Sequence, residues 1–243
     1  MPPPAADAPC PEQAFNATAL KWHTCAWLLL PVLVFLAGWM HWYAALPLTL
    51  LMAAGLTPRK RKEPQTRDSL PAFPLFTRSS FLALAAFAAL MALSGWGEWV
   101  NQHPDHIVRN ACLCELVASP WPVIFPDGNV LIYNTGFWLV PALAGKLAGL
   151  DAARVLVVLW GTWGLFLSWL WLCVFSGRRS LLLALLMAAF GSLLNFQCWL
   201  GLDLFRLHYF GTAEQIMCSA NASIPVLLLS LIHISEPTRH AQI

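Results

Sequence analysis

The residues best suited to chemistry lie in one polar stretch, residues 98–129, between apolar segments of membrane length. Asp105 stands near the start of this stretch, in the sequence Pro104-Asp105-His106. A carboxylate there could take a proton from an acceptor hydroxyl as a general base, or help to bind a divalent cation. The structural alternative is an N-cap, because Asp after Pro suits the start of a helix over residues 107–118. Asp105 is therefore the candidate catalytic residue.

Three further polar side chains of the stretch are candidate substrate-binding residues. Arg109 carries a planar guanidinium that can make two hydrogen bonds to a phosphate, although it could equally pair with Asp105 or Glu115. Asn110 follows it directly, and Glu98 lies at the membrane-proximal start of the stretch, between two tryptophans. The structural alternative for Glu98 is a polar residue at the membrane interface with no chemical role.

The sequence predicts no complete set of metal ligands. His103 and His106 flank Asp105, but a third ligand at suitable spacing is missing. The chain has 7 cysteines, and Cys112 and Cys114 lack both the CxxC spacing and histidine partners at zinc-finger spacing. The cofactor requirement is therefore open, with a divalent cation as the one candidate.

Composition indicates an integral membrane protein. Charged residues make up 11% of the chain, against about a quarter in soluble domains. The hydrophobic residues, 58% of the chain, form long unbroken blocks without alternation. In lipid the backbone must satisfy its hydrogen bonds in helices or closed barrels, and blocks of this kind favour helices. We therefore predict an all-α, polytopic membrane protein whose partner is the lipid bilayer. The net charge of +2 does not indicate nucleic acid.

The first half of the chain divides into four predicted segments. Residues 1–20 are rich in Pro and Ala and predict a disordered tail. Residues 21–57 predict a helical hairpin that turns at Trp39–Tyr43, with a single tilted helix as the alternative. Residues 58–79 carry a run of four basic residues and predict a cytoplasmic connector. Residues 80–97 predict a transmembrane helix that leads outward.

By this arrangement the loop 98–129 is extracytoplasmic. Within it the spacing of Ile107, Ala111, Cys114 and Ala118 predicts one apolar face of a juxtamembrane helix lying in the interface. Residues 130–228 predict about three transmembrane helices with a polar end. Residues 130–149 could either cross the membrane or re-enter it, because basic residues stand at both ends of the following span.

The last residues indicate a tail that is not native. Residues 229–239 have the sequence that a widely used transposase sequencing adapter encodes in one reading frame. We expect residues 229–243 to be a non-native tail, and we expect the protein's own chain to continue past Leu228.

The loop and the segment after it resemble bacterial multi-span proteins related to glycosyltransferases of the GT-C type. Asp105 and Asn110 fall on the acidic and Asn positions of the family motif, ahead of its W-P-V element at residues 121–123. The most specific match is Pro141-Ala142-Leu143-Ala144-Gly145-Lys146-Leu147-Ala148-Gly149. The chain departs from the motif where His106 replaces an aromatic residue and Arg109 replaces a histidine.

The resemblance implies an N-terminal fragment of a GT-C-like helical bundle in the bacterial inner membrane. The implied activity is transfer of a sugar from a polyprenyl-phosphate donor at the outer face, with Asp105 as the base and Arg109 at the donor phosphate. It also implies that residues 130–149 cross the membrane, which would make Lys146 and Arg154 cytoplasmic. The competing hypotheses are a transporter or flippase component, which would need intramembrane charges and inverted repeats, and an assembly protein without chemistry.

Overall fold

A computed structural model of the chain describes residues 14–15, 17–56, 73–74, 77–100, 102, 104–190 and 212–235. Within them the fold is helical, apart from a short antiparallel pairing of β1 (Ala14–Phe15) with β2 (Phe73–Pro74). The prediction of an all-helical protein is confirmed. The helices are α1 (Ala17–Trp39), α2 (Trp42–Leu56), α3 (Arg78–Leu93), α4 (Pro104–Ala118), α5 (Gly136–Ala148), α6 (Leu150–Ser176), α7 (Leu181–Ala189) and α9 (Thr212–Ser235).

Three of the described helices, α1, α6 and α9, are long and apolar enough to cross a membrane. Helices α2, α3 and α5 are apolar but have 10–17 residues. Residues 229–235, which belong to the adapter-like segment, continue the α9 helix. Residues 191–211, part of the region 130–228 where the sequence predicts about three transmembrane helices, lie outside the described residues.

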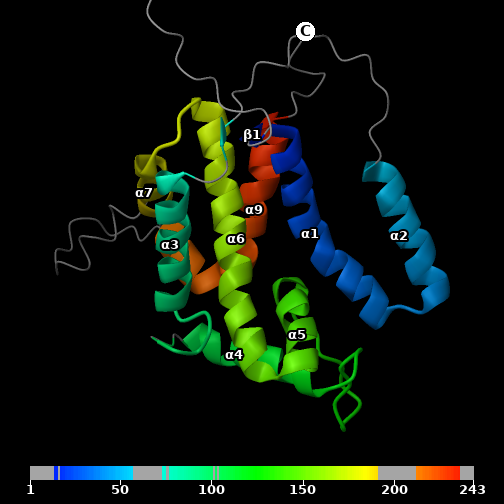
Figure 1. Ribbon diagram of the computed structural model, residues 1–243. Helices are drawn as coiled ribbons and strands as arrows, with labels where there is room; N and C mark the ends of the chain where they lie inside the picture. The colour runs from blue at the N-terminus through cyan, green and yellow to red at the C-terminus, as the bar shows by residue number, and fades with distance from the viewer. Residues whose placement is uncertain are drawn as a thin grey trace, which may run out of the picture.

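Helix α6 forms the centre of the bundle, with α1, α3, α5 and α9 packed around it (Figure 1). Close approach depends on glycine at Gly164, where an added Cβ would lie 2.5 Å from Cγ2 of Ile224 on α9. On the α1 side, Trp27 stacks on Trp160 with ring centroids 4.9 Å apart. The Trp27 indole also donates to the Trp160 carbonyl at 3.1 Å. The same Cβ at Gly164 would also lie 2.9 Å from Cζ2 of Trp27, so the small residue lets both α1 and α9 pack closely on α6.

The N-terminal helices differ in how they join this bundle. Helix α1 begins at Ala17, so the last residues of the expected disordered tail are helical, and Leu20 is fully buried. Met40 and His41 separate α1 from α2, within the segment where the sequence predicts a turn. Helix α2 has no buried residues, and among the described elements its contacts are mainly with α1.

Helix α5 contradicts the expectation that Lys146 and Arg154 lie on the face opposite the loop. It has 13 residues, or about 20 Å of helix, against about 30 Å of hydrocarbon. Gly149, with φ 91°, joins it directly to α6 as a tight hairpin. The Lys146 ammonium donates to the Ser119 carbonyl in the loop, and Arg154 pairs with Glu98. Both basic residues therefore lie at the loop's own end of the bundle, and a re-entrant α5 fits these contacts.

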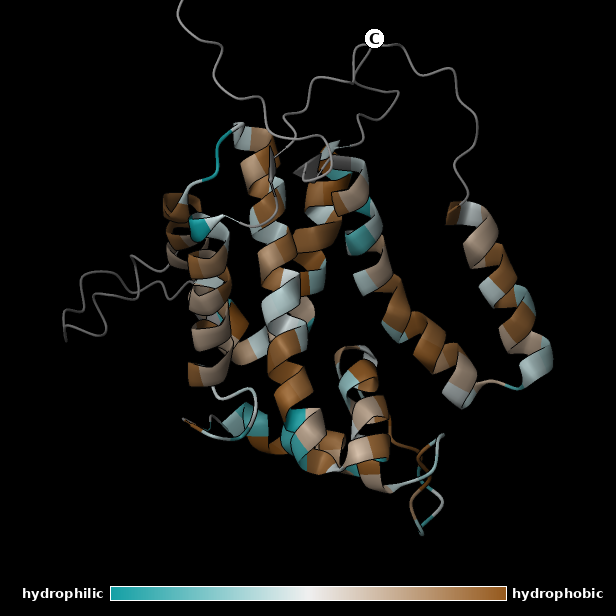
Figure 2. Cartoon of the chain, in the orientation of Figure 1, coloured by the Kyte–Doolittle hydropathy of each residue, from teal (hydrophilic) through white to brown (hydrophobic). Residues whose placement is uncertain are grey.

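Charged side chains are segregated between the two ends of the bundle. Every acidic side chain that the structure describes lies at the end covered by α4: Glu98, Asp105, Glu115, Asp127 and Asp151. Arg78, Arg178 and Arg179 lie at the opposite end, where α3 begins and α6 ends. Figure 2 shows these polar regions on either side of the apolar helices. Arg78, which belongs to the predicted connector 58–79, and the loop thus lie at opposite ends of the bundle, and the side of the membrane that each faces stays a prediction.

Candidate functional site

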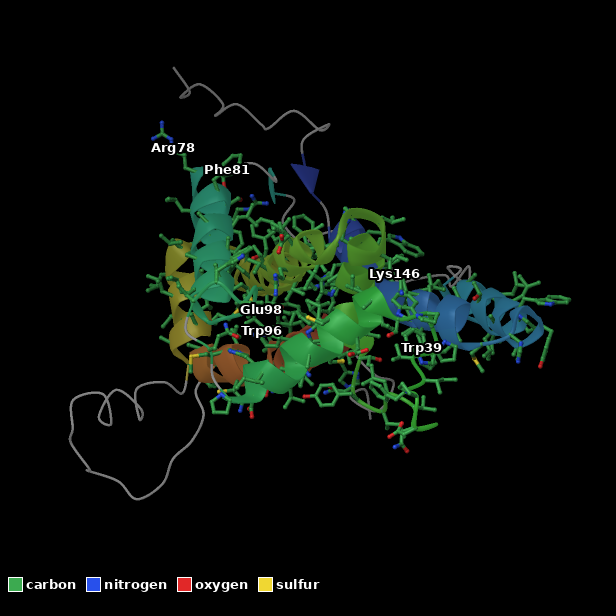
Figure 3. The ribbon with its side chains drawn as sticks, turned by 90° about the horizontal axis from the view of Figure 1, so that it is seen from below. Trp39, Arg78, Phe81, Trp96, Glu98 and Lys146 are labelled. Atoms are coloured by element: carbon green, nitrogen blue, oxygen red, sulfur yellow. The ribbon has the colours of Figure 1, made fainter. Side chains whose placement is uncertain are left out.

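Helix α4 lies across one end of the bundle, beneath the end of α3 and the start of α6 (Figure 1). Pro104 occupies its first position, where a missing N–H is harmless. Figure 3 looks onto this end, with Trp96 and Glu98 beside one part of α4 and Lys146 beside another. The candidate residues from the sequence are therefore gathered at one end, but they do not share one cluster.

Glu98 is held in an ion pair beneath the turn that follows α3. Its backbone φ is 67°, the only positive value among the described non-glycine residues. Such a conformation costs about 1–3 kcal/mol and persists only where surrounding contacts enforce it. Its Oε2 accepts from the Arg154 guanidinium, which also donates to Asp151 at 2.9 Å. Its Oε1 is buried and has no hydrogen-bond partner among the described residues.

The sequence did not indicate Arg154 as a partner of Glu98, because the two are separated by 56 positions. Cys114 on α4 lies close to the pair, since the negative charge of Glu98 is the second cause raising its thiol pKa, after burial. A carboxylate and a guanidinium thus lie between α3, α4 and α6. They tie the loop to the start of α6.

Asp105 lies in the first turn of α4 and is therefore inside the helix, so the N-cap alternative is wrong. Its carboxylate is favoured there by the positive end of the helix dipole. The side chain is 54% exposed, and its Oδ2 lies 3.7 Å from the Arg109 guanidinium. Of the two candidate carboxylates, Asp105 and Glu98, Asp105 is thus the one that faces outward and is accessible to a substrate.

Arg109 is largely buried, between α4 and α9. The residue is 7% exposed, its guanidinium carbon lies 5.5 Å from the Trp96 ring centroid, and it donates to the Cys218 carbonyl. Its guanidinium therefore contacts the protein itself, and the phosphate-binding role that the family resemblance implies stays a prediction. Arg109 acts as a structural residue between α4 and α9.

An interruption in α9 explains why Arg109 is buried. Ser219 has φ −152° and ψ 43°, which are not helical values, so α9 is kinked there. Three consecutive carbonyls before the break accept side-chain hydrogen bonds. The donors are Trp96 Nε1 to Ile216 at 2.9 Å, His106 Nε2 to Met217 at 3.0 Å, and Arg109 to Cys218. The cation at the end of this half-helix is also favoured by its dipole.

These contacts decide which face of α4 packs on the bundle. Ile107 is 67% exposed, and Ala111 and Ala118 are exposed as well. The buried face consists of His106, Arg109, Cys112, Leu113 and Leu116. The apolar face that the sequence predicts for the interface thus lies outside the bundle at Ile107, Ala111 and Ala118. On the buried face, His106 and Arg109 bond to α9 carbonyls.

Asn110 stabilises the loop through a side-chain hydrogen bond. Its Nδ2 donates to Gln102 Oε1 at 2.8 Å, and the Gln102 amide donates in turn to the Gly95 and Val100 carbonyls. This chain of bonds fixes the turn that carries Glu98. The contacts of Asn110 are therefore to the protein itself.

The described residues contain no group of three or more His, Cys, Asp or Glu side chains that could hold a metal ion. His103 lies outside the described residues. The fold and this end of the bundle define an all-helical protein with three helices long and apolar enough to cross a membrane. The chain matches no family model, no curated protein and no solved structure.

Proposed function

We propose that the chain belongs to a polytopic membrane glycosyltransferase of the GT-C type, which uses a lipid-linked sugar donor at the extracytoplasmic face of a bacterial inner membrane. The order of elements supports this proposal. An apolar helix (α3) leads to a loop with an acidic residue, a helix lying across the bundle end (α4), and a helical hairpin (α5 and α6). The GT-C enzymes that the chain resembles have the same order: a span, an outer loop that begins with an acidic residue and carries juxtamembrane helices, and then a helical hairpin.

The exposure of the Asp105 carboxylate is the observation on which the proposal rests. Its carboxylate is half exposed at the start of α4, at the end of the bundle where the described acidic residues gather. In the reaction it would take the proton of an acceptor hydroxyl while that oxygen attacks the anomeric carbon. The bond from this carbon to the lipid phosphate would break, and the phosphate would leave with the electron pair.

Glu98 and Asn110 have a different part in this proposal. They hold the loop through Arg154 and Gln102, and so they position the start of α4. Arg109 supports the same helix from inside. None of the three needs to contact the donor.

The test is transfer by the full-length protein carrying Asp105→Asn. Loss of a general base lowers turnover by about 10²–10⁴-fold, and membrane expression should be unchanged because the side chain is exposed. Glu115→Gln is the matched control on the same helix and should stay within a few-fold of wild type. Equal transfer by the Asp105→Asn variant and wild type would rule out Asp105 as the base.

A transporter or flippase component is the second candidate, and the break in α9 favours it. Discontinuous helices often form ion and substrate sites, because their free carbonyls can serve as ligands. Here the carbonyls of residues 216–218 are taken by Trp96, His106 and Arg109. Substrate flux across vesicles that is insensitive to Asp105→Asn would favour this candidate.

A further inference from the structure

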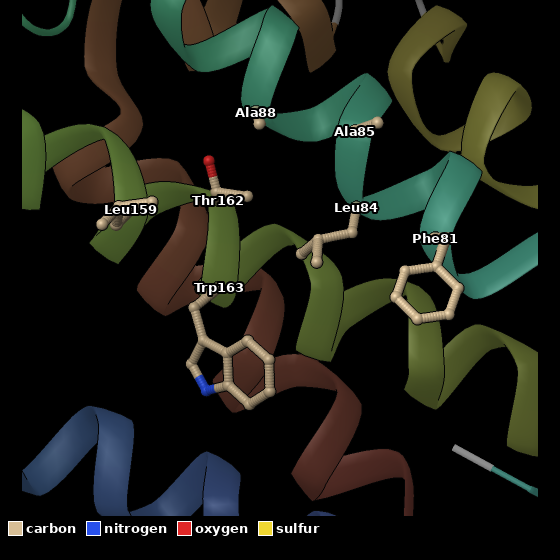
Figure 4. Close-up of a pocket in the computed structure, with 7 residues that line it drawn as sticks. All are labelled: Phe81, Leu84, Ala85, Ala88, Leu159, Thr162 and Trp163. Carbon is tan, nitrogen blue, oxygen red and sulfur yellow. The ribbon is translucent and has the colours of Figure 1, made fainter. Parts of the chain in front are cut away.

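A groove runs between α3 and α6 on the outer surface of the bundle (Figure 4). It has a volume of about 590 Å³, which is in the range of ligand pockets. Its lining is almost entirely apolar: Phe81, Leu84, Ala85 and Ala88 from α3, and Leu159, Thr162 and Trp163 from α6. The small side chains of the two alanines leave room for an occupant beside α3.

The α3 side of the groove leads directly to a positive charge. Arg78, Phe81, Ala85 and Ala88 are spaced three, seven and ten positions along α3, so they lie on one face of the helix. Arg78 is exposed at the first position of α3, and Phe81 is 59% exposed one turn later. In Figure 3 both lie at the end of α3.

A second arginine lies beside this end. Arg179 donates to Ser80 Oγ at 3.1 Å, and burial lowers the pKa of its guanidinium from the ordinary value. The α3 N-terminus adds partial positive charge and is capped only by Thr77. The described acidic side chains all lie at the other end of the bundle. Positive charge at the mouth and apolar surface below it complement a molecule with an anionic head and an apolar tail.

We propose that this groove binds an anionic phospholipid, with the phosphate at Arg78 and an acyl chain along Phe81, Ala85 and Ala88. Basic pockets between membrane helices bind anionic headgroups in this way. The site lies at the end of the bundle opposite Asp105, so it goes beyond the proposed transferase function and does not depend on it.

Photoreactive lipids test the proposal directly. The chain is placed in phosphatidylcholine nanodiscs with a trace of phosphatidylglycerol or phosphatidylcholine carrying a diazirine in the acyl chain. Cross-links are mapped by mass spectrometry. We expect phosphatidylglycerol to label residues 81–88 and 159–163 at least about fivefold more than phosphatidylcholine does, since each basic residue near the surface contributes about 1 kcal/mol.

Two variants separate the headgroup from the groove. Arg78→Gln should lower the phosphatidylglycerol preference by about fivefold, whereas Lys21→Gln, a basic residue at the same end on α1, should leave it unchanged. Ala88→Leu should reduce labelling in the groove by filling it. Equal labelling by the two lipids, or no effect of Arg78→Gln, would overturn the proposal.

Discussion

The role of Arg109 leads to the most decisive prediction. Arg109→Met keeps the apolar stem but removes the charge and all donors. A hydrogen bond from a charged group contributes about 1.5–3 kcal/mol. The cation–π contact with Trp96 adds about 0.5–1 kcal/mol, and the ion pair with the half-exposed Asp105 adds about 0.2–1 kcal/mol. Because such terms are not fully additive, we expect a loss of about 2–4 kcal/mol in the free energy of unfolding.

The loss should also be localised, because Arg109 bonds to the carbonyl just before the break at Ser219. Reversible denaturant unfolding in detergent micelles measures the free energy, and hydrogen exchange measures opening of α9. Asp105→Asn is the control, since it removes only the weak ion pair and should cost about 0.2–1 kcal/mol. A change below about 0.5 kcal/mol in Arg109→Met, with unchanged exchange in α9, would refute the structural role and return Arg109 to the list of possible phosphate ligands.

Three further predictions concern packing, thiol chemistry and topology. Gly145→Ala should cost about 1–3 kcal/mol in unfolding free energy, because the new Cβ would lie 2.8 Å from Ala153 Cβ, while Gly55→Ala, in open space, should not destabilise. Burial raises the pKa of the Cys112 thiol to about 11, so its alkylation should be slow at pH 8 and should rise towards pH 11. In a cysteine-free background, Lys146→Cys and Asp127→Cys should react with an impermeant maleimide from the same side of the membrane.

Each of these has a clear contrary result. Equal free energies of unfolding for the Gly145→Ala and Gly55→Ala variants would mean that α5 does not pack closely on α6. The raised Cys112 pKa means that the folded state keeps a proton that the unfolded state loses above about pH 9. Its contribution to stability should therefore fall as the pH rises from about 9 towards 11, and a rise over that window would contradict the burial of the thiol. Labelling of Lys146→Cys and Asp127→Cys from opposite sides would show that α5 crosses the membrane.

The sequence alone determined the features that depend on local composition. Long apolar blocks require helices in lipid, so the all-helical class follows from residues 22–56 and 154–175. The helix over residues 107–118 was predicted from spacing and from the prolines that follow it, and α4 covers it from Pro104 to Ala118. Asp105 was also identified from the sequence, and the structure leaves it outward-facing.

Only the tertiary structure decided which polar residues are used inside the protein. Glu98 meets Arg154, and Arg109 meets the Cys218 carbonyl, across 56 and 109 positions of sequence. The sequence around each residue does not indicate these pairings. A buried charge is stabilised by any partner that offers a hydrogen bond, and that partner can be far away in the sequence. The break in α9 creates the carbonyls that make burial of Arg109 favourable. The buried face of α4 therefore combines the apolar Cys112, Leu113 and Leu116 with two polar residues, His106 and Arg109, whose burial only the packing against α9 explains.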